Sequence, residues 1–149
     1  YDRMGYGFIS ASPEKDRMVS FGCLTTSGDL PFADRLLKLS RDLDELLTAQ
    51  RPDYAGVEKL YFGTNAKTAM DVGQARGVII LTLKEHNIPF VEITPLQIKL
   101  ATVGYGKADK KQVQSMVKIL LKLKEIPRPD DAADALAIAL CASRYLAQG

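Results

Sequence analysis

The segment 131–147 constrains the fold most, because it is a helical stretch with almost no polar face. After two carboxylates it continues in Ala, Ile and Leu to residue 140. A helix that is apolar all round is buried, so other elements must cover it. Asp131 and Asp134 are three residues apart and share one helix face. Carboxylates held against a packed interior need a partner, and a divalent cation is adequate for two. Alternatively, Asp130 or Asp131 caps the helix and Asp134 lies in a first turn favoured by the macrodipole.

The rest of the chain alternates strands with helices after an opening hairpin. Apolar spacing and turn residues predict strands over 4–12, 17–26, 54–58 and 88–93, and helices over 31–50, 65–84, 95–100, 109–123 and 131–147. That order is typical of an α/β fold with a mixed sheet flanked by helices. With 149 residues, 46% of them hydrophobic, the chain suits a single domain over 1–149 with a real core. Gly5 and Gly7 in the first strand predict a close approach of another backbone.

Basic residues are concentrated just before the acidic helix. Residues 99–128 carry eight Lys or Arg against two acidic residues, although the net charge of the chain is only +2. Lysines attract phosphates that bare carboxylates repel, so this order favours a polyanion guided toward a metal. Lys107, Lys110 and Lys111 follow a glycine-containing loop and begin a helix, which suits phosphodiester contact. A solvated lysine-rich helix face is the alternative.

Several classes of function are disfavoured. The loop at 103–107 is not a nucleotide-hydrolysing P-loop, because Ala101 and Ala108 replace the glycine and the hydroxyl residue that the pattern needs. Cys23 and Cys141 are far apart and are typical of reduced thiols in an intracellular protein. His86 is the only histidine, so histidine triads and multi-histidine metal sites are hard to build. No stretch has the length of a membrane span and no signal peptide is visible, so we expect a cytoplasmic protein.

Glu58 is a second acidic element, at the end of a short buried strand. Functional groups in α/β sheets gather at the carboxyl ends of strands. A glutamate at that place also commonly just leaves the core for solvent. Tyr61 and Phe62 follow it, and exposed rings beside a carboxylate can stack on unpaired bases. A place in the core is equally compatible with both rings.

Four motifs occur in a fixed order: VEKLYF at 57–62, GQARG at 73–77, VGYGKADK at 103–110 and DAADALA at 131–137. With them, from about residue 4 to the C-terminus, the chain closely resembles the RuvC family of Holliday-junction resolvases. The resemblance implies a ribonuclease H-like fold and a homodimer. It also implies metal-dependent cutting of two strands of a four-way DNA junction, in recombination and repair. A branch-migration helicase is a further partner that it leaves open.

Roles are carried over at matching positions only. By resemblance, Glu58, Asp131 and Asp134 are active-site carboxylates that hold two Mg²⁺ or Mn²⁺ ions, and oxygen ligands favour these ions over zinc. Lys99 and Lys110 match basic residues near the scissile phosphate. Tyr61, with Phe62, matches the aromatic that stacks at the opened junction centre, and the helix at 73–77 matches a region near the dimer interface.

The chain departs from the family at its start. The family begins with a central strand whose Gly-Ile-Asp-Pro-Gly-like end supplies the first catalytic aspartate, and this chain begins just after that place. Without that strand the sheet would hold unpaired backbone groups, each costing about 1–3 kcal/mol, so we expect roughly ten further N-terminal residues in the natural protein. The chain without them is expected to be a weak or inactive nuclease. Two alternatives stay open: a ribonuclease H-like nuclease without junction specificity, and a non-catalytic junction-binding module.

Overall fold

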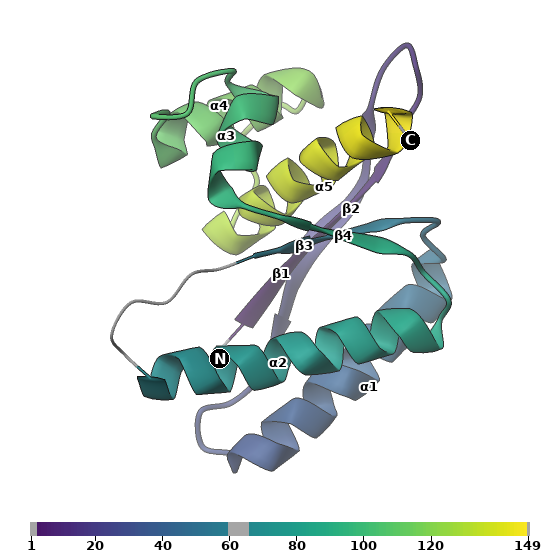
Figure 1. Cartoon of the computed structure of the whole chain (residues 1–149), viewed down its shortest axis with the longest axis vertical. Helices are drawn as coiled ribbons and strands as arrows, with labels where there is room; N and C mark the ends of the chain where they lie inside the picture. Colours follow the sequence, from purple (N-terminus) through teal and green to yellow (C-terminus); the bar gives the residue numbers. More distant parts are fainter. Residues whose placement is uncertain (1–2, 60–65, 149) are drawn as a thin grey trace. The chain divides into compact units, whose positions relative to one another are not determined.

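A computed structural model of the protein describes residues 3–59 and 66–148. Its elements, in chain order, are β1 (Arg3–Ser10), β2 (Arg17–Thr25), α1 (Phe32–Gln50), β3 (Ala55–Glu58), α2 (Ala66–Glu85), β4 (Phe90–Ile93), α3 (Pro95–Thr102), α4 (Lys110–Leu120) and α5 (Asp130–Gln148) (Figure 1). Each predicted strand and helix is present, and the differences lie at their ends. Among the described residues, none of the helices has the length and apolar character needed to cross a bilayer.

One end shows why the boundaries shift. α4 ends at Leu120 and not at 123 as predicted, because Lys122 adopts a left-handed conformation with φ of 55°. The amide of Leu123 then donates to the carbonyl of Lys118, which closes the helix. The apolar run continued past the turn, so the apolar pattern alone did not mark this stop.

The four strands pair as two two-stranded sheets, β1 with β2 and β3 with β4. Both belong, with α3, α4 and α5, to one compact unit, whereas α1 and α2 form a second. In the second unit Leu39, Leu43 and Leu47 make the buried stripe of α1. Their spacing of four residues is that of one helix face, as the leucine pattern predicted.

In the larger unit, α5 provides the centre of the core. Its residues 132, 133, 136, 137, 140, 141 and 142 are all at most 4% exposed. Those at 136, 137, 140 and 141 belong to one core cluster with Ile93 of β4, Ile98 of α3, Val113 and Val117 of α4, and Leu121 just after α4. The predicted burial of the apolar C-terminal helix is therefore confirmed.

Glycines bring α5 close to both sheets. On β1, a Cβ at Gly5 or Gly7 would meet atoms of α5, and on β3 a Cβ at Gly56 would meet Ile138 and Ala142 of α5 at 3.0 and 2.9 Å. The close backbone approach predicted for Gly5 and Gly7 is confirmed. The acidic start of α5 is thereby fixed against β1.

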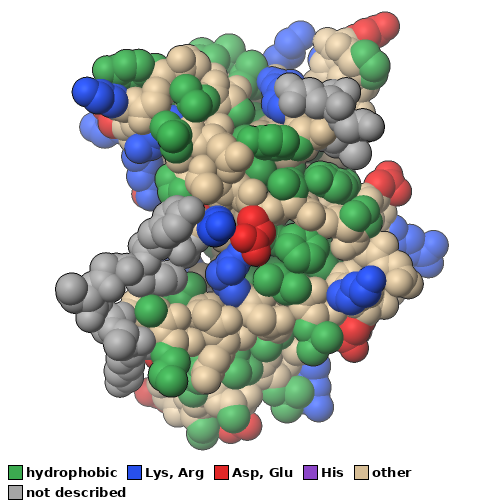
Figure 2. All heavy atoms as spheres, in the orientation of Figure 1, with side chains coloured by type: hydrophobic (Ala, Val, Ile, Leu, Met, Phe, Trp, Pro, Cys, Tyr) green, Lys and Arg blue, Asp and Glu red, His purple; other side chains and the backbone are tan. Residues whose placement is uncertain are grey.

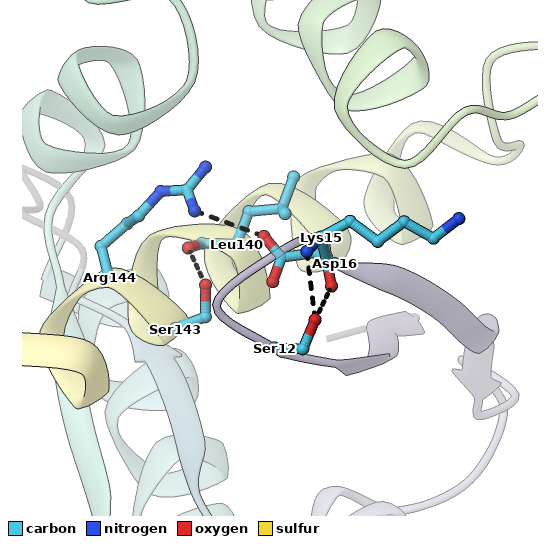
Figure 3. Close-up of polar contacts among 6 residues, drawn as sticks. All are labelled: Ser12, Lys15, Asp16, Leu140, Ser143 and Arg144. Carbon is cyan, nitrogen blue, oxygen red and sulfur yellow. Dashed lines mark hydrogen bonds and ion pairs between the residues drawn. The ribbon is translucent and has the colours of Figure 1, made fainter.

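The tip of the β1–β2 hairpin is tied to the other end of α5 (Figure 3). The Ser12 hydroxyl accepts a hydrogen bond from the amide of Lys15 at 3.1 Å and donates to its carbonyl, which closes the turn. The next residue, Asp16, accepts a 3.3 Å bond from the Arg144 guanidinium of α5. The hairpin therefore contacts α5 near both of its ends.

The lone histidine and the two cysteines have structural surroundings. We expect His86, from its place in the sequence, to be an exposed residue at a helix end; it does directly follow α2, but its ring is only 22% exposed and shares a 2.7 Å hydrogen bond with the Asp44 carboxylate of α1. Cys141 is buried and its thiol contacts the Gln97 carbonyl at 3.5 Å. Neither Cys23 nor Cys141 is in a disulfide, as predicted.

Candidate active site

Glu58 stands where β3 leaves the sheet. The amide of Lys59 still donates to the Ile93 carbonyl of β4 at 2.7 Å, so the pairing extends one residue beyond Glu58. This bond restricts the backbone on both sides of the carboxylate. The Glu58 side chain is half-buried, and it is not a residue that simply leaves the core for open solvent.

The acidic residues of α5 occupy its first two turns. The helix begins at Asp130, so Asp131 lies inside it and not at the N-cap. A favourable interaction with the helix macrodipole remains available to Asp130 and Asp131. Asp134 lies one turn further on, and its side chain is 40% exposed.

Lys110 joins the start of α4 to these carboxylates. Its Nζ lies 3.5 Å from Asp130 Oδ2 and 3.6 Å from Asp134 Oδ2. The position of Lys110 is set by a capping box at the start of α4. There the Asp109 carboxylate accepts from the Gln112 amide and the Gln112 side chain accepts from the Asp109 amide, both at 2.8 Å.

The pKa values show that these charges affect one another. Burial, then the charges of Asp134 and Asp131, raise the pKa of Glu58, while Lys110 acts in the opposite direction. Burial likewise raises the pKa of Asp134, again opposed by Lys110. The charge of Asp134 in turn raises the pKa of Lys110, which favours its protonated form. The cluster is a set of partly desolvated carboxylates around one lysine.

The three predicted carboxylates are thus brought together with Lys110, whereas the other predicted lysines have no ion pair with them in the described part of the chain. Lys99 is half-buried on α3, and no ion pair links it to the cluster in the described part of the chain. Lys107 and Lys111 are exposed beside Lys110. Tyr61 and Phe62 lie outside the described residues.

The sequence predicts only a capping role for Asp130, yet in the structure Asp130 forms an ion pair with Lys110. The only indication in the sequence is that Asp130 directly precedes Asp131. The ion pair with Lys110 cannot be predicted without knowing where α4 begins in space.

The donor set fits a hard divalent cation by its chemistry. Carboxylate oxygens are the ligands that Mg²⁺ and Mn²⁺ prefer, and partial burial strengthens their need for positive charge. Within residues 3–59 and 66–148, however, no group of three or more His, Cys, Asp or Glu side chains is arranged to hold a metal ion. In this arrangement Lys110 provides the compensating charge for Asp130 and Asp134.

Acidic residues from a strand end and a helix start, with a lysine beside them on an α/β scaffold, are typical of nucleases with the ribonuclease H-like fold. Comparison with known proteins narrows this class. The family model described as crossover junction endodeoxyribonuclease RuvC matches residues 1–142. The chain belongs to this family.

Individual relatives agree. The crossover junction endodeoxyribonuclease RuvC of Roseiflexus sp. is 51% identical, over 93% of this chain and 83% of the relative. That of Alkaliphilus oremlandii is 46% identical, over 93% and 84%. Among solved structures, T. thermophilus RuvC in complex with a Holliday junction substrate matches with a TM-score of 0.90 at 31% identity, over 99% of this chain and 90% of that one.

These findings confirm the predicted family, the ribonuclease H-like α/β fold and the class of enzyme. The family is one of metal-dependent endonucleases acting on DNA crossover junctions. The comparisons do not test the roles of individual residues, the kind and number of metal ions or the subunit arrangement, which stay predictions.

Replacing Glu58 by Gln should raise the stability of the metal-free protein at neutral pH. The raised pKa of Glu58 means that the folded state disfavours its ionised form, and a neutral amide removes that penalty. The carboxylate's contribution is most favourable below its unfolded pKa and is lost as pH rises through the folded pKa. The gain from Gln should therefore be full at pH 7, on the order of a few degrees in Tm, and should vanish at acid pH.

Thermal unfolding at pH 7 and near the ordinary glutamate value of 4.5 measures this difference. Glu45→Gln on the exposed face of α1 is the matched control and should leave Tm unchanged at both pH values. A lower Tm for Glu58→Gln at pH 7 would contradict the expectation.

Proposed function

We propose that this protein resolves four-way DNA junctions by hydrolysing phosphodiester bonds at the cluster of Glu58, Asp131 and Asp134. The observation that carries the proposal is the ion pair of Lys110 with Asp134, together with the raised pKa of Glu58 beside them. The ion pair joins the starts of α4 and α5, and the charges of Asp134, Lys110 and Asp131 act on Glu58 at the end of β3. Membership of a junction endonuclease family supports the same assignment.

We further propose that these three carboxylates hold two divalent ions, Mg²⁺ or Mn²⁺. Such ions would supply an activated water and stabilise the charge on the attacked phosphate and the leaving oxygen. The protein's own contribution is to hold the carboxylates in fixed positions. Lys110, which stays protonated, places a positive charge where the phosphate gains negative charge. Lys99 is proposed to approach the phosphate only with DNA present.

The proposed DNA contacts outside the cluster are Lys107 and Lys111, with stacking of Tyr61 and Phe62 on unpaired bases at the junction centre. Figure 2 shows basic and acidic side chains interspersed over the drawn face, not gathered into fields of one sign. We expect phosphate attraction at the lysines that begin α4, within the basic stretch 99–128.

A second copy of the chain is the proposed partner of α2. Met70, Gly73, Gly77 and Leu81 lie on one face of this helix and are all exposed, with Met70 at 65% and Leu81 at 60%. A Cβ at either glycine would meet nothing within 4 Å. This exposed face of apolar residues and glycines suits a two-fold homodimer, and a dimer suits a junction because two equivalent strands must be cut. Light scattering should give the mass of two chains.

The test of this function compares two DNA substrates with the natural full-length protein in Mg²⁺. A four-way junction should be cut symmetrically, while a linear duplex of the same sequence should stay intact. Equal cutting of both would support a ribonuclease H-like nuclease without junction specificity. Binding without any cutting would support a non-catalytic junction-binding module, for which a branch-migration helicase would be the natural partner. We also propose that this activity takes place in the cytoplasm.

The double substitution Lys107→Ala and Lys111→Ala should flatten the salt dependence of junction binding. If each lysine neutralises one phosphate, the slope of log affinity against log salt should fall by about 1.8. Lys110 is left in place so that its ion pairs with α5 persist. Lys38→Ala is the control, because Lys38 pairs with Asp42 on α1 at a 2.6 Å contact. An unchanged slope in the double variant would show that these lysines face away from the DNA.

A further inference from the structure

Gly5 of β1 lies against the peptide group of an acidic residue in α5. A Cβ built on Gly5 would be 1.9 Å from the Asp131 carbonyl oxygen, 2.3 Å from its carbonyl carbon and 3.0 Å from the Ala132 nitrogen. All three obstacles are backbone atoms. They cannot rotate aside as a side chain can, so the strand or the helix itself would have to move.

Gly7 is the natural comparison for Gly5. The two residues are two apart on one strand and project from the same face. A Cβ at Gly7 would meet Leu136, at 2.7 Å from Cδ2, 2.9 Å from Cγ and 3.0 Å from the amide nitrogen. The two closest atoms belong to the Leu136 side chain, which can change rotamer without moving the helix, although Leu136 is only two residues beyond Asp134. Of the two, Gly5 is the one whose added Cβ has the Asp131 peptide as its nearest neighbour.

We infer that Gly5 is a positioning residue for the carboxylate cluster, because its missing side chain lets β1 touch the first turn of α5 at Asp131. The inference rests on the proposed function. Asp131 and Asp134 belong to one helix, so a displacement at Asp131 is carried to Asp134. Lys110 and Glu58 are held by α4 and by the β3–β4 pairing, so a shift of the start of α5 changes their distances to Asp131 and Asp134.

The size of the displacement decides the effect. A contact of 1.9 Å must open to at least 3.0 Å before it resembles any real Cβ contact, so strand and helix must separate by more than 1 Å. Misplacement of catalytic groups by about 1 Å can cost about 100-fold in rate. We therefore expect Gly5→Ala to impair metal binding and cleavage more than its loss of stability alone would explain.

The experiment measures Mn²⁺ affinity by calorimetry, Tm, and junction cleavage for Gly5→Ala, Gly7→Ala and Gly28→Ala in the natural full-length protein. Gly28→Ala is the neutral control, because its Cβ would meet nothing within 4 Å. Gly5→Ala should weaken Mn²⁺ binding at least 10-fold and slow cleavage about 100-fold, with metal-free junction affinity unchanged. Gly7→Ala should lower Tm while Mn²⁺ affinity stays within about twofold.

Equal Mn²⁺ affinity in Gly5→Ala and Gly7→Ala, at equal loss of Tm, would overturn the inference and leave Gly5 with a packing role only. If Gly5→Ala is too unstable to measure in buffer alone, the same measurements are made in sucrose, which favours the folded state. A Gly5→Ala chain that stays unfolded there would also overturn a positioning role. Asp134→Asn, measured in parallel, separates the two levels: wild-type Mn²⁺ affinity in that variant would defeat the proposed function itself.

Discussion

Replacing Asp134 by Asn should abolish junction cleavage and leave junction binding intact. The amide keeps the size of the side chain but removes the charge that pairs with Lys110 and, as proposed, ligates a divalent ion. Groups that merely support metal ligands cost about 10–100-fold when replaced, so loss of a ligand should cost at least 100-fold. Cleavage of a labelled four-way junction in Mg²⁺ and a gel-shift assay in Ca²⁺ measure the two properties separately.

Two results would count against this expectation. Undiminished cutting by Asp134→Asn would remove Asp134 from the site, and loss of junction binding would show a role in DNA contact or folding instead. Asp42→Asn on α1 is a suitable control, since Asp42 also accepts a lysine ion pair but lies on the unit that carries no cluster residue. It should cut and bind as the unmodified protein does.

Replacing Lys110 by Ala should slow cleavage by about 100-fold or more, the usual cost of removing one preorganised group that stabilises transition-state charge. Its second effect is on pH dependence. Lys110 opposes the rise in the pKa of both Glu58 and Asp134, so its removal should raise both pKa values further. The acid limb of the cleavage profile should consequently move to higher pH, because protonated carboxylates release metal.

The pH profile separates this role from simple phosphate attraction. Lys118→Ala, two turns along α4, removes a positive charge without touching the carboxylates and should leave the acid limb in place. If Lys110→Ala lowers the rate but does not shift the limb, its ion pairs with Asp130 and Asp134 do not govern the cluster's protonation.

The carboxylates were predictable because their signals are local. Asp131 and Asp134 share a helix face by spacing alone. Glu58 is the last residue of a short apolar strand. The order of strands and helices gave the α/β class for the same reason, since each element carries its own apolar period. Gly5 and Gly7 predicted that another backbone segment approaches the first strand closely.

The features of the site that the sequence does not predict depend on how the helices and strands pack against one another. That Asp130 joins Lys110 follows from where the capping box directs the start of α4, and no residue of either helix encodes that meeting by itself. That Gly5 meets Asp131, and not another residue, is likewise a result of the angle at which α5 passes β1. Whether Lys99 forms an ion pair with the cluster likewise depends on how α3 packs on α5, and in the described residues it forms none.

The burial of the apolar face of α5 has a consequence for local opening of the chain. Residues 132, 133, 136 and 137 are no more than 1% exposed, so their amides cannot reach water while the surrounding core stays closed. Deuterium uptake at these positions therefore requires cooperative opening of the larger unit, and not fraying of one helix end. The acidic groups stand at the edge of the most protected helix, and a ligand that binds them would slow exchange across the whole unit.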